Sequence, residues 1–286
     1  QVMTAIGALT LYDSINLLKT ADIAGSLTLE ALYGVREAFD ERIHQARGQI
    51  GQMLSAKNIR RLTQASTYLT FQDEMRIQDA YSLRCLAQVH GASSDALGYV
   101  KEKIEIEMNA ATDNPLIFED KVISGGNFHG QVLAQAFDFL KIAISEIANI
   151  SERRIERLVN PALNCGLPPF LVASPGLNSG FMIVQYSAAS LVSENKVLAH
   201  PASVDSIPSS GNQEDHVSMG TIAARQAKEI LDNATKVIAM ELFSACQALD
   251  FRPKKEMGAG TAIAYQVIRE ELPFLASDEI MYPYLE

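Results

Sequence analysis

The sequence predicts an all-α protein that is built as a bundle of long helices and carries one small β-hairpin. Apolar residues recur at helical spacing over long stretches that contain no proline. Proline and glycine gather in a few loops between those stretches, and only one short segment has the pattern of paired strands. With 286 residues, of which 48% are hydrophobic, the chain has ample material for a large core.

The helical stretches follow one another along nearly the whole chain. A buried helix is predicted from Gln1 to about Thr20, and several short helices over residues 22–61. Glycines mark the expected ends of these short helices: Gly25, Gly34, Gly48 and Gly51. One long helix is predicted over residues 79–112, where Asp113-Asn114-Pro115 stops it.

Three further helices are predicted over residues 131–159, 181–200 and 214–250. At 1.5 Å per residue the last would be on the order of 50 Å long. The hairpin is predicted at residues 116–118 and 122–124, and two loops rich in proline and glycine at residues 160–180 and 200–212. No flexible linker divides the chain, so residues 1–286 are expected to form a single helical unit, with its bundle shared between subunits.

Composition narrows the classes of function. The net charge of -10 argues against nucleic acid as a partner, because its phosphates would be repelled. No basic block or long apolar run indicates a membrane. The three cysteines are far apart and odd in number, which favours free thiols in a reducing cytoplasm over a disulfide framework or a metal site: Cys85, Cys165 and Cys246. We therefore expect a cytoplasmic protein without a metal, whose partners are small molecules or proteins.

A first candidate site lies at the head of the helix predicted from residue 79. Gln78, Tyr81 and Arg84 are three residues apart, so one side of a helix would carry all three. A guanidinium binds a carboxylate through two parallel hydrogen bonds, and a phenol and an amide can orient the rest of a small polar ligand. The alternative is that Arg84 pairs with Asp79 or Glu74 while Tyr81 only packs.

Two more polar stretches have no evident structural need, residues 125–130 and 203–216. Glu214 beside His216 could form an acid/base couple. Alternatively, Glu214 is a partner of the helix dipole in the first turn of its helix, and His129 and His216 are structural histidines. The charged run at residues 152–157 is expected to be a solvated or intersubunit face.

Seven short motifs resemble, in order, the histidine ammonia-lyase branch of the aromatic amino acid lyases. They are QDAYSLR (78–84), SGGNFH (124–129), SERR (151–154), GLPPFL (166–171), PGLNSGFM (175–182), HPASVDSIP (200–208) and NQEDHVSM (212–219). The resemblance extends over essentially the whole chain. The acid at Glu214 is typical of the histidine branch, because the phenylalanine and tyrosine branches usually lack it.

The resemblance implies a homotetramer with a fumarase/aspartase-like helical core, which eliminates ammonia from L-histidine to give trans-urocanate. Arg84 would bind the substrate carboxylate, Tyr81 would act as a catalytic residue beside the reacting amine, and Gln78 would position them. Phe128 would wall the ring pocket. Glu214, also catalytic, would meet the imidazole or amino group.

The sequence also departs from this family. The family's electrophile, 4-methylidene-imidazol-5-one (MIO), forms from an Ala-Ser-Gly tripeptide, and this sequence contains none. Ser209-Ser210-Gly211 and Asn178-Ser179-Gly180 are the nearest matches, but both lie inside other motifs. No residue of this chain is therefore assigned to the cofactor. We expect the chain to be the C-terminal portion of a larger lyase, and to be unable to catalyse the reaction without the N-terminal region.

Two other functions remain open at this point. The chain could be a tetramerisation core without activity of its own. It could also be a lyase of the fumarase and aspartase type, whose serine-rich loop resembles residues 206–212. The Lys-Asn-Pro ending expected of that loop is replaced here by Gln213-Glu214-Asp215.

Overall fold

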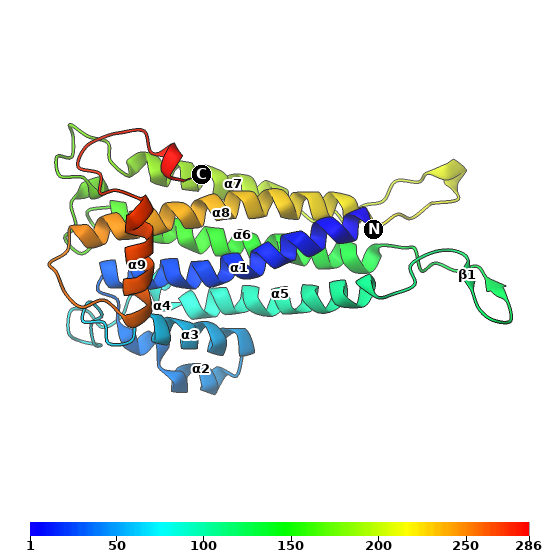
Figure 1. Cartoon of the computed structure of the whole chain (residues 1–286), viewed down its shortest axis with the longest axis horizontal. Helices are drawn as coiled ribbons and strands as arrows, with labels where there is room; N and C mark the ends of the chain where they lie inside the picture. Colours follow the sequence, from blue (N-terminus) through cyan, green and yellow to red (C-terminus); the bar gives the residue numbers. More distant parts are fainter. Residues whose placement is uncertain (286) are drawn as a thin grey trace.

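The computed structural model describes residues 1–285 and consists of helices with one small hairpin. Five long helices form the bundle (Figure 1): α1 (Val2–Ala31), α5 (Leu86–Met108), α6 (Gln131–Val159), α7 (Met182–Leu198) and α8 (Gly220–Asp250). Four shorter helices join them: α2 (Glu41–Arg47), α3 (Ile50–Leu62), α4 (Tyr81–Arg84) and α9 (Ala259–Glu271). Strands β1 (Leu116–Ile117) and β2 (Val122–Ile123) pair antiparallel. The predicted fold class is confirmed.

The two ends of the bundle carry different segments (Figure 1). At one end, which we call the hairpin end, lie the N-terminus, the β1–β2 hairpin, the start of α6 and the loop between α7 and α8. At the other, the α9 end, lie α4, α9 and the loop between α6 and α7. Helix α5 runs from the α9 end to the hairpin end; its 23 residues span roughly 35 Å at 1.5 Å per residue.

Helix α1 corrects the prediction for the first sixty residues. It continues through Gly25 to Ala31 and does not end near residue 20. Gly25 lies where α1 meets α5: a Cβ placed there would be 2.3 Å from Leu86 Cδ1. This glycine therefore permits a close helix contact and does not end a helix.

Two other predicted helices also differ from the structure. The helix expected over residues 79–112 starts within two residues of the prediction, but it is interrupted at Cys85, which separates α4 from α5, and it ends at Met108. Helix α8 begins at Gly220 because Met219, just before it, has a left-handed backbone with φ 56°. Glu214 consequently lies in a loop and is not a first-turn partner of the helix dipole. The prediction for residues 131–159 is confirmed to the residue, and the one for 181–200 within two residues.

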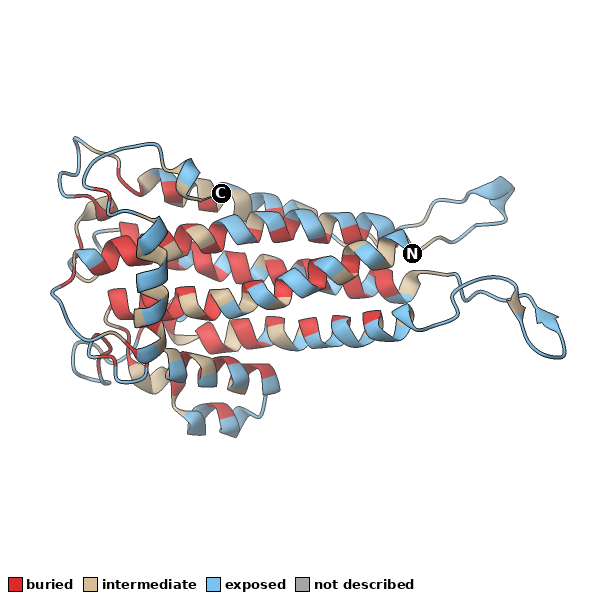
Figure 2. Ribbon diagram, in the orientation of Figure 1, coloured by how far each residue is buried: buried red, intermediate tan, exposed pale blue. Residues whose placement is uncertain are grey.

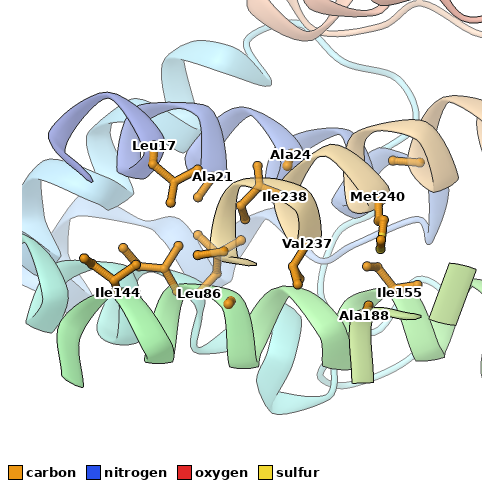
Figure 3. Packing of buried hydrophobic residues seen from close by; sticks show 14 of the residues in the cluster. Leu17, Ala21, Ala24, Leu86, Ile144, Ile155, Ala188, Val237, Ile238 and Met240 are labelled. Atoms are coloured by element: carbon orange, nitrogen blue, oxygen red, sulfur yellow. The ribbon is translucent and has the colours of Figure 1, made fainter. Parts of the chain in front are cut away.

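The core lies where α1, α5, α6 and α8 face one another, and the buried faces of these helices point inward (Figure 2). Figure 3 shows Leu17, Ala21 and Ala24 of α1 packed near Ile238 of α8, with Ile144 of α6 on the opposite side. Many of the buried residues of α8 are alanines, whose small side chains let helix axes approach closely: Ala223, Ala224, Ala227, Ala234, Ala245 and Ala248.

A fully buried ion pair joins α6 to α8 in the middle of this core. Arg154 Nε and Nη2 donate to the two carboxylate oxygens of Glu241 at 2.5 and 2.7 Å. Ser151 and Thr28 donate to the same carboxylate at 2.6 and 2.8 Å. The expectation of a solvated or intersubunit face at residues 152–157 is therefore wrong for Arg154, which points into the bundle.

A buried carboxyl group near the α9 end makes stability depend on pH. Glu30 Oε1 accepts from Gly258 N at 2.8 Å and from Thr261 Oγ1 at 2.9 Å, while Oε2 has no partner within the described residues. Burial raises the pKa of Glu30, so the folded state favours the neutral acid. This contribution to stability is complete below the ordinary carboxyl pKa and is lost as pH rises through the raised pKa of the folded state.

We expect Glu30→Gln, a neutral side chain of the same shape, to stabilise the protein at pH 8 relative to the wild type and to do so less at pH 5. The gain at pH 8 should be roughly 1–3 kcal/mol, because burial penalises the ionised carboxylate of the wild type at that pH while glutamine carries no charge. Urea unfolding at both pH values measures it. Glu229→Gln, on the exposed side of α8, is the control. An equal change at both pH values would contradict the assignment.

Candidate functional site

The segment before α4 is held in place by a buried carboxylate. Asp79 Oδ2 accepts from Val35 N at 2.7 Å, and Oδ1 accepts from Arg76 Nε at 2.6 Å. Arg76 also donates to the carbonyl oxygens of Leu32 and Tyr33. Because Asp79 is committed to these partners, it does not pair with Arg84, and that alternative is wrong.

Gln78, Tyr81 and Arg84 do come together, although Gln78 precedes the helix. Arg84 Nη1 donates to Gln78 Oε1 at 2.5 Å. The guanidinium carbon lies 4.9 Å from the centroid of the Tyr81 ring, a cation–π contact. Tyr81 is 71% exposed, so it does not simply pack. Within residues 1–285 Arg84 forms no salt bridge, neither with Glu74 nor with any other acid.

These three side chains line an open cavity of about 490 Å³ between the start of α5 and the segment around η1 (Arg36–Phe39). Arg84 Nε and Gln88 Oε1, both in the wall, are buried without a hydrogen-bond partner among the described residues. A guanidinium in a cavity of this size can bind a small anion, and its geometry matches that of a carboxylate, although the acidic Glu37 also lines the cavity.

The second group of predicted site residues lies at the hairpin end. Phe128 is 58% exposed. His129 Nε2 lies 3.0 Å from His216 O, and the two imidazole rings stack with centroids 5.7 Å apart. Glu214 is exposed, and its Oε2 accepts from Ser209 Oγ at 2.6 Å. The structure thus pairs Glu214 with Ser209, and no hydrogen bond in the described chain joins Glu214 to His216.

One chain does not bring the two groups together. Arg84 lies at the α9 end and Glu214 at the hairpin end, with the length of α5 between them (Figure 1). Gln78 and Tyr81 lie with Arg84 at the α9 end, and Phe128 lies with Glu214 at the hairpin end.

The two tripeptides that come nearest to a cofactor precursor are both engaged in local structure. Ser210 and Gly211 form an exposed turn with left-handed φ angles of 49° and 64°. Ser179 N and Gly180 N donate to the carboxylate of Asp278 at 2.8 and 2.7 Å. Neither lies in the cavity beside Arg84.

Three other features bear on the function of the chain: metal ligands, cysteine thiols and helices that could cross a membrane. Over residues 1–285 no cluster of three histidine, cysteine or acidic side chains is arranged to hold a metal ion. All three cysteines are free thiols, and burial raises the pKa of Cys246 to about 12. In the same part of the chain, no helix combines the length and the apolar character that crossing a bilayer requires.

Sequence reasoning missed two buried charged pairs, Arg154 with Glu241 and Lys141 with Asp138. A signal was present for the second. Asp138 and Lys141 stand three residues apart on the apolar face of the predicted helix 131–159, where charged residues are rarely left without a partner.

The all-α bundle of long helices is a fold that this chain shares with solved structures of lyases. A profile described as aromatic amino acid lyase matches residues 1–270, and the chain belongs to this family. Histidine ammonia-lyase from Alkaliphilus oremlandii is 64% identical over 284 residues, which cover 99% of this chain and 56% of that protein. The chain spans about half the length of the curated relatives it matches.

Solved structures agree with the fold. The crystal structure of histidine ammonia-lyase from Trypanosoma cruzi superposes with a TM-score of 0.92 at 43% identity, covering 99% of this chain and 54% of that one. Tyrosine aminomutase from Streptomyces globisporus superposes with a TM-score of 0.96 at 37% identity, covering 99% and 58%. The helical fold is therefore shared by family members whose names indicate different reactions.

Proposed function

We propose that this chain is the C-terminal portion of a cytoplasmic histidine ammonia-lyase, which converts L-histidine to trans-urocanate and ammonia. The observation that carries the proposal is the guanidinium of Arg84, which faces an open cavity without a carboxylate partner in residues 1–285. The 64% identity to a histidine ammonia-lyase supports histidine as the substrate.

In this proposal Arg84 binds the substrate carboxylate, and Gln78 holds the guanidinium in place through the 2.5 Å hydrogen bond. The ring of Tyr81 contacts the same guanidinium, and Tyr81 acts as a catalytic residue beside the reacting amine. Phe128 walls the imidazole pocket. Glu214 offers a carboxylate to the imidazole or amino group, which is a charge-assisted pair if that group is cationic.

Because the two groups of residues lie at opposite ends of one chain, a pocket that uses both takes them from different copies. We infer a homotetramer in which the hairpin end of one copy lies against the α9 end of another. Exposed Phe139 and Ile142 on α6, each 48% exposed, line a largely apolar groove against α5 that such packing would cover.

The family's MIO group does not fit any residue assigned in this chain, because the precursor tripeptide is absent and its nearest matches lie away from the cavity. We infer that an upstream segment supplies it. The complete enzyme is this chain together with that segment.

Ultraviolet absorbance at the urocanate band, after mixing with L-histidine, tests the proposal. We expect no change with this chain alone and a steady increase with the complete enzyme. Urocanate formed by the chain alone would overturn the inference that it is inactive. A complete enzyme that binds no histidine and forms no urocanate would overturn the function.

Glu214→Gln in the complete enzyme should reduce turnover by about a hundredfold while leaving the unfolding midpoint nearly unchanged, because the side chain is exposed and lies outside the core. Initial rates and a thermal melt measure the two effects. Asp205→Asn, another exposed acid in the same loop, is the matched control and should retain activity. Equal losses of rate and stability would indicate a purely structural role.

A tetramerisation core without activity of its own is the second candidate, favoured by the exposed apolar groove between α5 and α6. Sedimentation of the isolated chain tests it: a monomer would contradict this role, whereas a stable tetramer is expected under both candidates. The fumarase and aspartase alternative has no support beyond the serine-rich loop, since residues 1–270 match the aromatic amino acid lyases.

A further inference from the structure

The loop that carries Glu214 has an exposed tip and a buried base. This loop, residues 199–219, joins α7 to α8 and projects beyond the helix ends (Figure 1); we call it the Glu214 loop. Its base contacts two charged residues of α6, Asp138 and Lys141, which are 3% and 0% exposed. Charged groups are rarely buried so completely unless every hydrogen bond is made, so their partners matter.

Lys141 has a full set of acceptors. Its Nζ lies 2.7 Å from Asp138 Oδ1, 2.7 Å from His200 O and 2.7 Å from Gln226 Oε1. An ammonium group has three protons to donate, and here each has an acceptor. These three contacts hold His200, near the start of the Glu214 loop, against α6 and α8.

Asp138 binds Ala202 and Ser203 of the same loop. Its Oδ1 accepts from Ala202 N at 3.1 Å and its Oδ2 from Ser203 N at 2.8 Å. Burial alone would raise the pKa of Asp138, but the hydrogen bonds from Lys141 and from the loop lower it below the usual value. The carboxylate is therefore ionised, and the ion pair is satisfied on both sides.

Further hydrogen bonds between the two sides of the Glu214 loop connect its base to its tip. Beyond Ser203, Ser206 Oγ accepts from Val217 N at 2.9 Å. This bond joins the part of the loop that follows α7 to the part that precedes α8. Farther out, the backbones of Ser209 and Glu214 exchange hydrogen bonds at 3.0 and 3.3 Å. These contacts give a path through which a displacement at Ser203 can reach Glu214.

We propose that Asp138 and Lys141 are positioning residues that set the place of the Glu214 carboxylate for the lyase reaction. The inference rests on the proposed function, and it adds two buried residues that do not touch the substrate. A displacement of about 1 Å at a reacting group can cost roughly a hundredfold in rate, so an anchor at the base of the loop has catalytic consequences.

The test is a double-mutant cycle in the complete enzyme with Asp138→Asn and Glu214→Gln. Asp138→Asn keeps the shape but removes the charge that pairs with Lys141. We expect it to lower kcat/KM for L-histidine by about ten- to a hundredfold. In the Glu214→Gln background the same change should alter kcat/KM less than twofold, because there is no carboxylate left to position.

Glu241→Gln is the matched control, since it removes a charge from a buried ion pair that contacts no loop. Measured below the unfolding temperature of every variant, it should leave kcat/KM within about twofold of the wild type. Additive losses from Asp138→Asn and Glu214→Gln, or an equal loss with Glu241→Gln, would overturn the positioning role and leave only a structural one.

Hydrogen exchange on this chain provides a second readout that does not depend on activity. Lys141→Met should speed exchange of the amides of Ser203, Glu214 and Val217 at least tenfold relative to those in the middle of α6. Unchanged exchange would overturn the inference. A complete enzyme that makes no urocanate with Glu214 intact would instead overturn the proposed function, while the exchange data would still decide the anchoring.

Discussion

On the proposed function, Arg84→Met should lower kcat/KM of the complete enzyme for L-histidine by about a hundred- to a thousandfold, with little effect on the unfolding midpoint. The expected size follows from losing one partner of a desolvated, hydrogen-bonded charge pair, which costs about 2–5 kcal/mol. Arg84 is half-buried in the cavity wall and makes its one side-chain hydrogen bond to Gln78, so the core does not depend on it.

Arg84→Lys separates the contribution of the positive charge from that of the hydrogen-bonding geometry of the guanidinium. A lysine keeps the positive charge but cannot reproduce two parallel hydrogen bonds, so we expect it to recover only part of the lost rate. Initial rates over a range of histidine concentrations measure both variants. Arg42→Met, which removes an arginine that is paired with Asp40 on the surface, is the control and should be as active as the wild type. Full activity of Arg84→Met would remove the observation that carries the proposed function.

Glu241→Ala destabilises the isolated chain by about 3–5 kcal/mol, the largest effect on stability that we expect from a single substitution. It leaves the guanidinium of Arg154 buried in the centre of the bundle without a counter-charge. Ser151 and Thr28 also lose their acceptor. Urea unfolding, monitored by the loss of helical circular dichroism, measures the change.

The matched comparison is the double replacement Arg154→Leu with Glu241→Leu. Replacing both partners of a buried ion pair by apolar residues is often nearly neutral, so the double variant should be clearly more stable than Glu241→Ala. If the two variants unfold at the same urea concentration, the cost arises from packing volume and not from the unpaired charge.

The sequence predicted most of the bundle because long stretches with apolar residues at helical spacing contain no proline and are separated by loops rich in proline and glycine. Helix α6 was predicted to the residue: apolar residues recur at helical spacing along it, and Pro161 follows its C-terminal cap, Asn160. The failures have local causes. Cys85 interrupts a helix without a proline or glycine, and Gly25 lies inside one because a neighbouring helix needs the space.

The candidate site was predicted in part. The spacing of Gln78, Tyr81 and Arg84 was sufficient to group them, although Gln78 reaches the others from a loop. The sequence could not indicate that Ser209 holds Glu214, since that contact depends on a turn in which Ser210, Gly211 and Asn212 all have left-handed backbones. Nor could it pair Lys141 with the carbonyl of His200, because the contact joins two distant segments.

The direction of α5 has a consequence for how the enzyme would respond to its own concentration. In the proposed assembly, each chain has binding groups at both ends of α5, so it would contribute to two pockets and complete neither by itself. Association between copies then governs the number of working pockets by mass action, in the same way that a ligand governs the stability of its receptor. If the proposed assembly forms, dilution below its dissociation constant should abolish activity even when Arg84 and Glu214 are both present.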